Sequence, residues 1–163
     1  MRNRRQREKG SALIEMAFMM PWIAFLFVGI LDMGFYSHGA MATQNAARAI
    51  ALQSTTNSAA NICQVAKNEM GFLPNVAGMG ACAGSQAGVT NATPIWVCTG
   101  TLTNTATAVC GLPAAVCADC ALDATATSIQ AVVTYKMIPL VPIPGFLTGQ
   151  LTLTRLAEAR IIQ

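Results

Sequence analysis

The sequence predicts an α+β protein: one long N-terminal helix packs on a small antiparallel sheet, and disulfides staple a loop-rich insertion. Three observations predict this fold class. An almost unbroken apolar run extends from Met16 to Tyr36, two segments near the C-terminus alternate with period two, and six cysteines lie between residues 63 and 120. A length of 163 residues suits one folded domain beside one membrane segment.

The first ten residues, MRNRRQREKG, form a basic leader. They hold five of the ten basic residues, and they account for the formal net charge of +3. Residues 11–163 carry five basic and six acidic residues, so they form no basic footprint for a nucleic acid. Lys and Arg beside a first membrane span stay in the cytoplasm. We therefore expect the C-terminal part to be exported.

The apolar run has the length of a membrane span. Met16 to Tyr36 covers about 31 Å at 1.5 Å per residue, which matches a bilayer core. Glu15 stands at its start, and a charge at the centre of a membrane helix costs roughly 2.5–3.5 kcal/mol. Glu15 is therefore a functional candidate, or else a carboxylate that snorkels to the headgroups. Pro21 interrupts the helix, and Asp32 is expected near the outer edge, where water reaches it.

The helix is expected to continue beyond the membrane. Residues 38–70 are rich in Ala and lack Pro, which predicts an amphipathic extension that ends near Gly71. A separate amphipathic helix in its own domain is the alternative. The predicted domain organisation is a leader over 1–10, a transmembrane helix over 11–37, the extension over 38–70 and a cysteine-rich domain over 71–163. The narrow stripe expected on the extension consists of Met41, Ala42, Asn45, Ala46, Ala49 and Gln53.

The C-terminal third predicts an antiparallel pair of strands. Residues 128–138 alternate with the period of a half-buried strand, and residues 150–162 form the second strand. Residues 94–98 predict a further short strand. The connection PLVPIPGFLTG over 139–149 is unusually apolar, so it either folds back onto the sheet or contacts a subunit or the membrane.

The cysteines predict disulfides, because all of them lie on the exported side and their number is even. Six cysteines allow fifteen pairings, which the sequence does not resolve. Cys117 and Cys120 have CxxC spacing, but the strand-to-helix context of a thioredoxin is absent, and Ala121 stands where a haem site needs His. A zinc site with two distant cysteines is a further alternative. The disulfide candidates are Cys63, Cys82, Cys98, Cys110, Cys117 and Cys120.

The sequence predicts no enzyme, cofactor or metal centre. It contains no GxSxG, HExxH or P-loop motif, and its single histidine, His38, excludes most acid–base schemes that use imidazole. Asp119 and Asp123 are four residues apart, but two acids at that spacing make a poor cation site.

The N-terminal motif resembles a class III, prepilin-type signal sequence, and more specifically the TadE-like proteins of tight-adherence (Flp-type) systems. The residues that carry the resemblance are Gly10, Glu15, Pro21, Gly29, Asp32, Phe35 and Tyr36. The resemblance implies a minor pilin or pseudopilin that a prepilin peptidase cuts between Gly10 and Ser11. It implies assembly roles for Glu15, which would meet the free amine of a neighbouring subunit, and for Pro21. The cysteine-rich middle lies outside this motif.

The same resemblance implies the partners and the location. The expected partners are the prepilin peptidase, other pilin-like subunits, an inner-membrane assembly platform and the lipid bilayer, with no nucleic acid. The expected location is the bacterial inner membrane, with a cytoplasmic N-terminus, or a surface pilus. Two alternatives are a single-span envelope or assembly protein and a secreted cysteine-rich binding domain cut after Ala42, where Ala40-Met41-Ala42 offers an A-x-A site.

Overall fold

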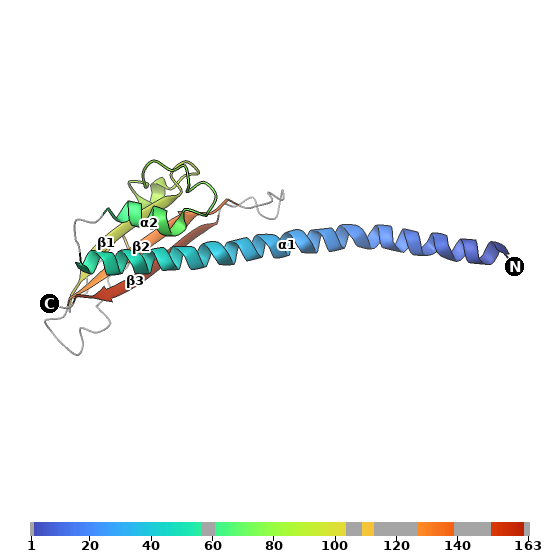
Figure 1. The fold of residues 1–163 in the computed structure, drawn as a ribbon, viewed down its shortest axis with the longest axis horizontal. Helices are drawn as coiled ribbons and strands as arrows, with labels where there is room; N and C mark the ends of the chain where they lie inside the picture. Colours follow the sequence, from blue (N-terminus) through green and yellow to red (C-terminus); the bar gives the residue numbers. More distant parts are fainter. Residues whose placement is uncertain (1, 57–60, 104–108, 113–126, 139–150, 162–163) are drawn as a thin grey trace.

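A computed structural model of the protein describes residues 2–56, 61–103, 109–112, 127–138 and 151–161, with side chains from residue 13 onward. Two helices, a short 3-10 helix and three strands follow one another along the chain (Figure 1). They are α1 (Arg2–Thr56), α2 (Ile62–Met70), η1 (Gln86–Gly88), β1 (Ile95–Leu102), β2 (Ser128–Lys136) and β3 (Thr152–Arg160). The predicted α+β fold, a long helix on a small antiparallel sheet, is confirmed.

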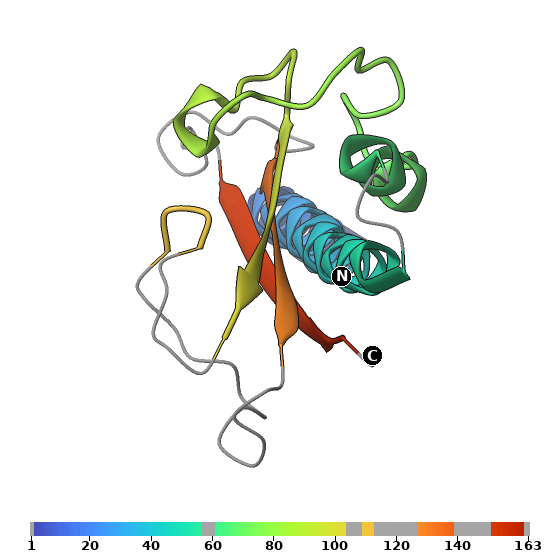
Figure 2. The same ribbon diagram turned by 90° about the vertical axis from the view of Figure 1, so that its left-hand side faces the viewer.

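Helix α1 has two halves with different surroundings. Its N-terminal half projects away from the rest of the molecule, and its C-terminal half lies along one face of the sheet (Figures 1 and 2). The approach is close because small residues line the contact: a Cβ added to Gly39 would lie 3.7 Å from Leu153 Cδ1 and 3.8 Å from Tyr135 Cε1. Ile50, which is fully buried, is the largest α1 side chain in this core.

The buried face of α1 is rotated from the predicted stripe. Ala42 and Ala46 are buried as expected, but Met41, Asn45 and Gln53 are exposed. The packed positions recur every three or four residues, as one helix face requires. They are Gly39, Ala42, Thr43, Ala46, Ala47, Ile50, Ala51 and Ser54. The prediction chose the wrong face of the helix, because the helix faces on both sides of Ala42 and Ala46 are rich in small residues. The buried face is the one that contains Ile50.

The single helix expected over 38–70 is two helices in the structure. Helix α1 ends at Thr56, where the hydroxyls of Thr55 and Thr56 donate to the carbonyls of Leu52 and Gln53. Helix α2 begins after Asn61, whose Oδ1 accepts a hydrogen bond of 3.1 Å from the amide of Gln64. Ser, Thr and Asn side chains compete for backbone hydrogen bonds, so the polar run between Ser54 and Asn61 favours helix ends over a helix interior.

The sheet has three antiparallel strands in the order β1-β2-β3. The two predicted C-terminal strands are present as β2 and β3, and the short strand expected at 94–98 is longer, forming all of β1. Strand β2 is buried on both faces except at Lys136, although its alternation predicted a half-buried strand. It is the central strand: α1 covers one face, and residues such as Val109, which meets Gly100, lie over the other. The connection 139–149 lies outside the described residues.

Candidate functional site

The exposed half of α1 is the most unusual surface of the molecule. Between Leu13 and Met33 its large apolar side chains are 47–75% exposed, whereas such side chains are normally buried in a soluble domain. The stretch from Leu13 to Thr56 is long and apolar enough to contain a membrane span. Leu13 to Met33 alone covers about 31 Å as a helix, which is the thickness of a bilayer core.

The predicted assembly residues lie on this exposed half. Glu15 is exposed, and it lies two residues after Leu13 at the start of the exposed apolar stretch. Pro21 lies within α1, which continues through it to Thr56. Proline has no amide hydrogen, so the carbonyl of Ala17 receives no bond from position 21. A carboxylate and a helix carbonyl with an unfilled acceptor therefore lie within two turns of each other in an otherwise apolar segment.

The predicted processing site lies in the first turns of α1. Gly10 and Ser11 have helical backbone, and their surroundings lie outside the described side chains. The structure therefore places these two residues upstream of Glu15 on the same helix.

The boundary between the two halves of α1 lies near residue 34. Phe35 and Tyr36 are half-buried and pack against the core of the domain. Asp32 is only 8% exposed, so the expectation that water reaches this residue is wrong. The Asp32 side chain is thus withdrawn from solvent, while its neighbours Leu31 and Met33 stay 56% and 67% exposed.

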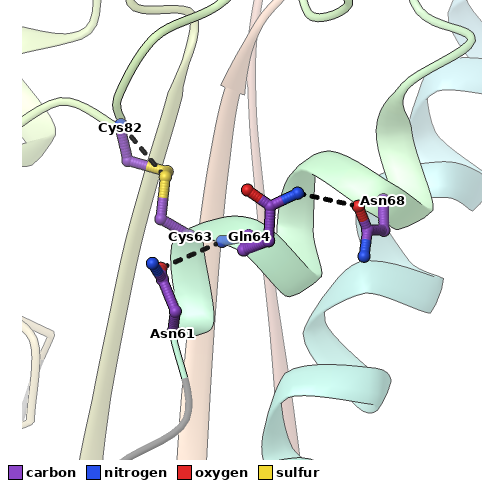
Figure 3. The surroundings of a disulfide bond; sticks show 5 residues. All are labelled: Asn61, Cys63, Gln64, Asn68 and Cys82. Carbon is purple, nitrogen blue, oxygen red and sulfur yellow. Dashed lines mark hydrogen bonds between the residues drawn. A yellow bond between two sulfur atoms is a disulfide. The ribbon is translucent and has the colours of Figure 1, made fainter.

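Two disulfides crosslink the described part of the domain. Cys63 of α2 joins Cys82, and the amide of Cys82 donates to Cys63 Sγ over 3.0 Å (Figure 3). The second disulfide joins Cys98 of β1 to Cys110. Four of the six candidates thus form disulfides, while Cys117 and Cys120 lie outside the described residues.

The two disulfides supply crosslinks in a region that has little helix or strand. The bonds close loops with sequence separations of 19 and 12 residues, and each such crosslink stabilises a domain by about 3 kcal/mol. Asn61 caps the start of α2, and Gln64 Nε2 donates to Asn68 Oδ1 within the helix, so both bonds support α2 beside the first disulfide (Figure 3). The described cysteines are therefore structural, and the described residues contain no group of three His, Cys, Asp or Glu side chains that holds a metal.

One contact was not anticipated from the sequence. The ring of Phe72, just beyond α2, lies 4.8 Å from the ring of His38, with an interplanar angle of 47°. Phe72 remains 59% exposed. An isolated aromatic residue directly after a helix-ending Gly71 was the only sequence signal for it.

The comparisons with known proteins agree with the N-terminal motif. A family model described as TadE-like protein matches residues 10–52. No curated protein and no solved structure matches the chain. The match begins at the predicted processing residue, Gly10, and ends inside the packed half of α1, so it covers both the exposed apolar helix and its entry into the domain. The resemblance predicted from the sequence is therefore confirmed, and the N-terminal helix of this chain is similar to that of TadE-like proteins.

Proposed function

We propose that the protein is a minor pilin or pseudopilin of a tight-adherence system, made as a precursor and cut between Gly10 and Ser11 by a prepilin peptidase. The TadE-like match indicates a pilin-like tight-adherence component. The observation that carries the proposal is the division of α1. The large apolar side chains between Leu13 and Met33 are 47–75% exposed, and the same helix then forms the spine of a folded domain.

The exposed half of α1 has the properties of a subunit that moves from a bilayer into a helix bundle. Lipid surrounds the apolar side chains before assembly, and neighbouring helices surround them afterwards. Glu15 is costly in either apolar medium unless it gains a partner. Cleavage before Ser11 creates an α-amine, which is a cation at the cytoplasmic end of the helix. The pairing of Glu15 with the Ser11 amine of a neighbouring subunit then offsets the cost only when the subunits dock in register.

The test of processing compares two glycine substitutions in the same helix. Gly10→Val is expected to block cleavage, because it changes the residue that precedes the cut. Gly29→Val is the matched control, since a Cβ at Gly29 meets nothing within 4 Å. N-terminal sequencing and intact mass of the protein from native membranes measure the outcome. A normal start at Ser11 in the Gly10→Val variant contradicts the proposed site, and an uncut wild-type chain supports the single-span envelope protein.

The test of assembly uses Glu15→Ala, with Glu15→Asp as the conservative variant. Glu15→Ala is expected to be cut normally and to be inserted in the membrane, but to be lost from sheared surface filaments at least tenfold, as about 1.4 kcal/mol of lost docking energy per subunit requires. Glu15→Asp is expected to restore part of the incorporation. Equal amounts of wild type and Glu15→Ala in the filament fraction would refute the docking role.

The secreted-domain alternative conflicts with the packing of α1. Its cleavage site after Ala42 lies inside the packed half of the helix, where Ala42 is 4% exposed and Thr43 is fully buried. Cleavage there removes Phe35, Tyr36 and Gly39 from their contacts with the domain. The single-span alternative keeps these contacts, so the state of the N-terminus distinguishes it from a processed pilin-like subunit.

A further inference from the structure

We propose that the end of the domain that carries Phe72 and His38 rests in the headgroup layer of the bilayer that holds α1. The domain would then touch the membrane surface instead of standing clear of it on its helix. This inference rests on the membrane insertion of α1 in the proposed function. It adds a second membrane contact, made by the folded domain.

The path of the chain brings Phe72 to this end. Helix α2 lies beside α1 and leads back from the far end of the domain toward the N-terminal half of α1 (Figures 1 and 2). Its last turn is followed by Gly71 and then by Phe72, whose ring contacts His38. Phe72, although 34 positions after His38 in sequence, thus lies beside the part of α1 where the exposed apolar stretch ends.

The distance from the apolar stretch sets the depth of Phe72. His38 lies five residues, about 7.5 Å, beyond Met33, which is the last large exposed side chain of that stretch. It lies two residues, about 3 Å, beyond the predicted span end at Tyr36. The headgroup layer on each side of a bilayer core is roughly 5–7 Å thick. Both boundaries therefore place the His38–Phe72 pair within this layer or at its outer limit.

Some of the exposed apolar side chains of the described domain, namely Met41, Phe72 and Leu151, lie toward the same end. Beyond the span, five large apolar residues of the described chain are exposed: Met41, Leu52, Phe72, Leu151 and Leu156. Met41 is one turn from His38 on the same helix face. Leu151 precedes β3, which runs away from the N-terminal half of α1 (Figure 1). Leu153, two residues later, lies beside Gly39 of α1, so the start of β3 lies near this end of the domain.

The bilayer is the partner that this placement favours. Met41 lies on α1 itself, and Phe72 contacts α1 through His38, so a medium that surrounds the apolar half of α1 lies next to both side chains. Trp and Tyr are enriched at the membrane interface because each combines an apolar ring with a polar group. The Phe72 ring, tilted by 47° against the His38 imidazole, brings an apolar ring and a polar ring together in a similar way.

The experiment uses the full chain in vesicles of phosphatidylcholine and phosphatidylglycerol. A photoreactive benzoylphenylalanine replaces one residue at a time at Phe72, Leu26 and Leu52. Leu26 is 61% exposed within the span and is the positive control. Leu52 is 65% exposed on α1, about 21 Å beyond His38, and is the matched control for an exposed apolar residue away from the membrane. Intact mass after illumination detects a phospholipid adduct, and the Cys63–Cys82 disulfide reports that the domain is folded.

The expected result is an adduct at position 72 within about threefold of that at position 26, with background labelling at position 52. An adduct at 26 without one at 72 overturns the inference and leaves the membrane insertion of α1 intact. A crosslink from 72 to a second copy of the chain overturns it in favour of a subunit contact. Background labelling at all three positions overturns both the inference and the insertion of α1 on which it rests.

Discussion

Removing the Ile50 side chain tests whether the packed half of α1 is the spine of the domain. Ile50 is fully buried between α1 and the sheet, and Ile→Ala in such a site costs about 2–5 kcal/mol through lost burial and the cavity left behind. Leu52 lies two residues later on the same helix and is 65% exposed, so Leu52→Ala is the matched control. Its expected change lies within about 0.5 kcal/mol.

The assay is urea unfolding of the full chain in non-ionic detergent, followed by the fluorescence of Trp96, which is buried in β1. With a slope of about 2 kcal/mol per molar urea, a loss of 3 kcal/mol lowers the midpoint by about 1.5 M. The midpoint of Leu52→Ala is expected to stay close to that of the wild type. Equal shifts for the two variants would refute the assignment of the buried face, and so would a larger shift for Leu52→Ala.

Three further substitutions test the sheet. Gly100→Ala is expected to destabilise the domain by about 1–3 kcal/mol, because the new Cβ would clash with Val109 Cγ1. Val109→Ala in the same chain is expected to restore part of the loss in urea midpoint. Burial raises the pKa of Tyr135 from 10.0 to about 12, so the unfolded chain releases this proton first as the pH rises, and the contribution to stability is full below pH 10 and lost as the pH approaches 12. The wild type is expected to lose about 1.4 kcal/mol more than Tyr135→Phe between pH 9 and pH 11, and parallel pH profiles of the urea midpoint would contradict this.

The sequence was most informative where its pattern repeats over many residues. The long apolar run, the alternation of 128–138 and the motif from Gly10 to Tyr36 each predicted an element or a resemblance that is confirmed. The end of α1 was missed because the absence of Pro between 38 and 70 was given more weight than the Ser, Thr and Asn run that starts at Ser54. The burial of Asp32 was missed because depth along a helix does not show which residues the folded domain covers.

The residues of the candidate site also differ in whether the sequence alone identifies them. Glu15 and Pro21 were identified because a carboxylate and an imino acid are conspicuous in an apolar segment. Phe72 was not identified, since its importance comes from a contact with His38 that joins residues 34 positions apart. The pairings Cys63–Cys82 and Cys98–Cys110 also depend on the fold, because any of fifteen pairings fits the sequence alone.

The continuity of α1 connects the two halves of the molecule mechanically. The helix has no break between Met33 and Gly39, where the exposed apolar half becomes the core of the domain. Rotation of the exposed half about its axis therefore rotates the sheet with it, and docking of Glu15 against a neighbour would fix which face of the domain points outward. A membrane contact at Phe72 would oppose that rotation until the subunit leaves the bilayer. Insertion of a flexible Gly-Gly-Ser segment after Gly34 should then leave the domain folded and the N-terminus processed, while assembly fails. Normal assembly of such a variant would show that the rigid junction has no role in docking.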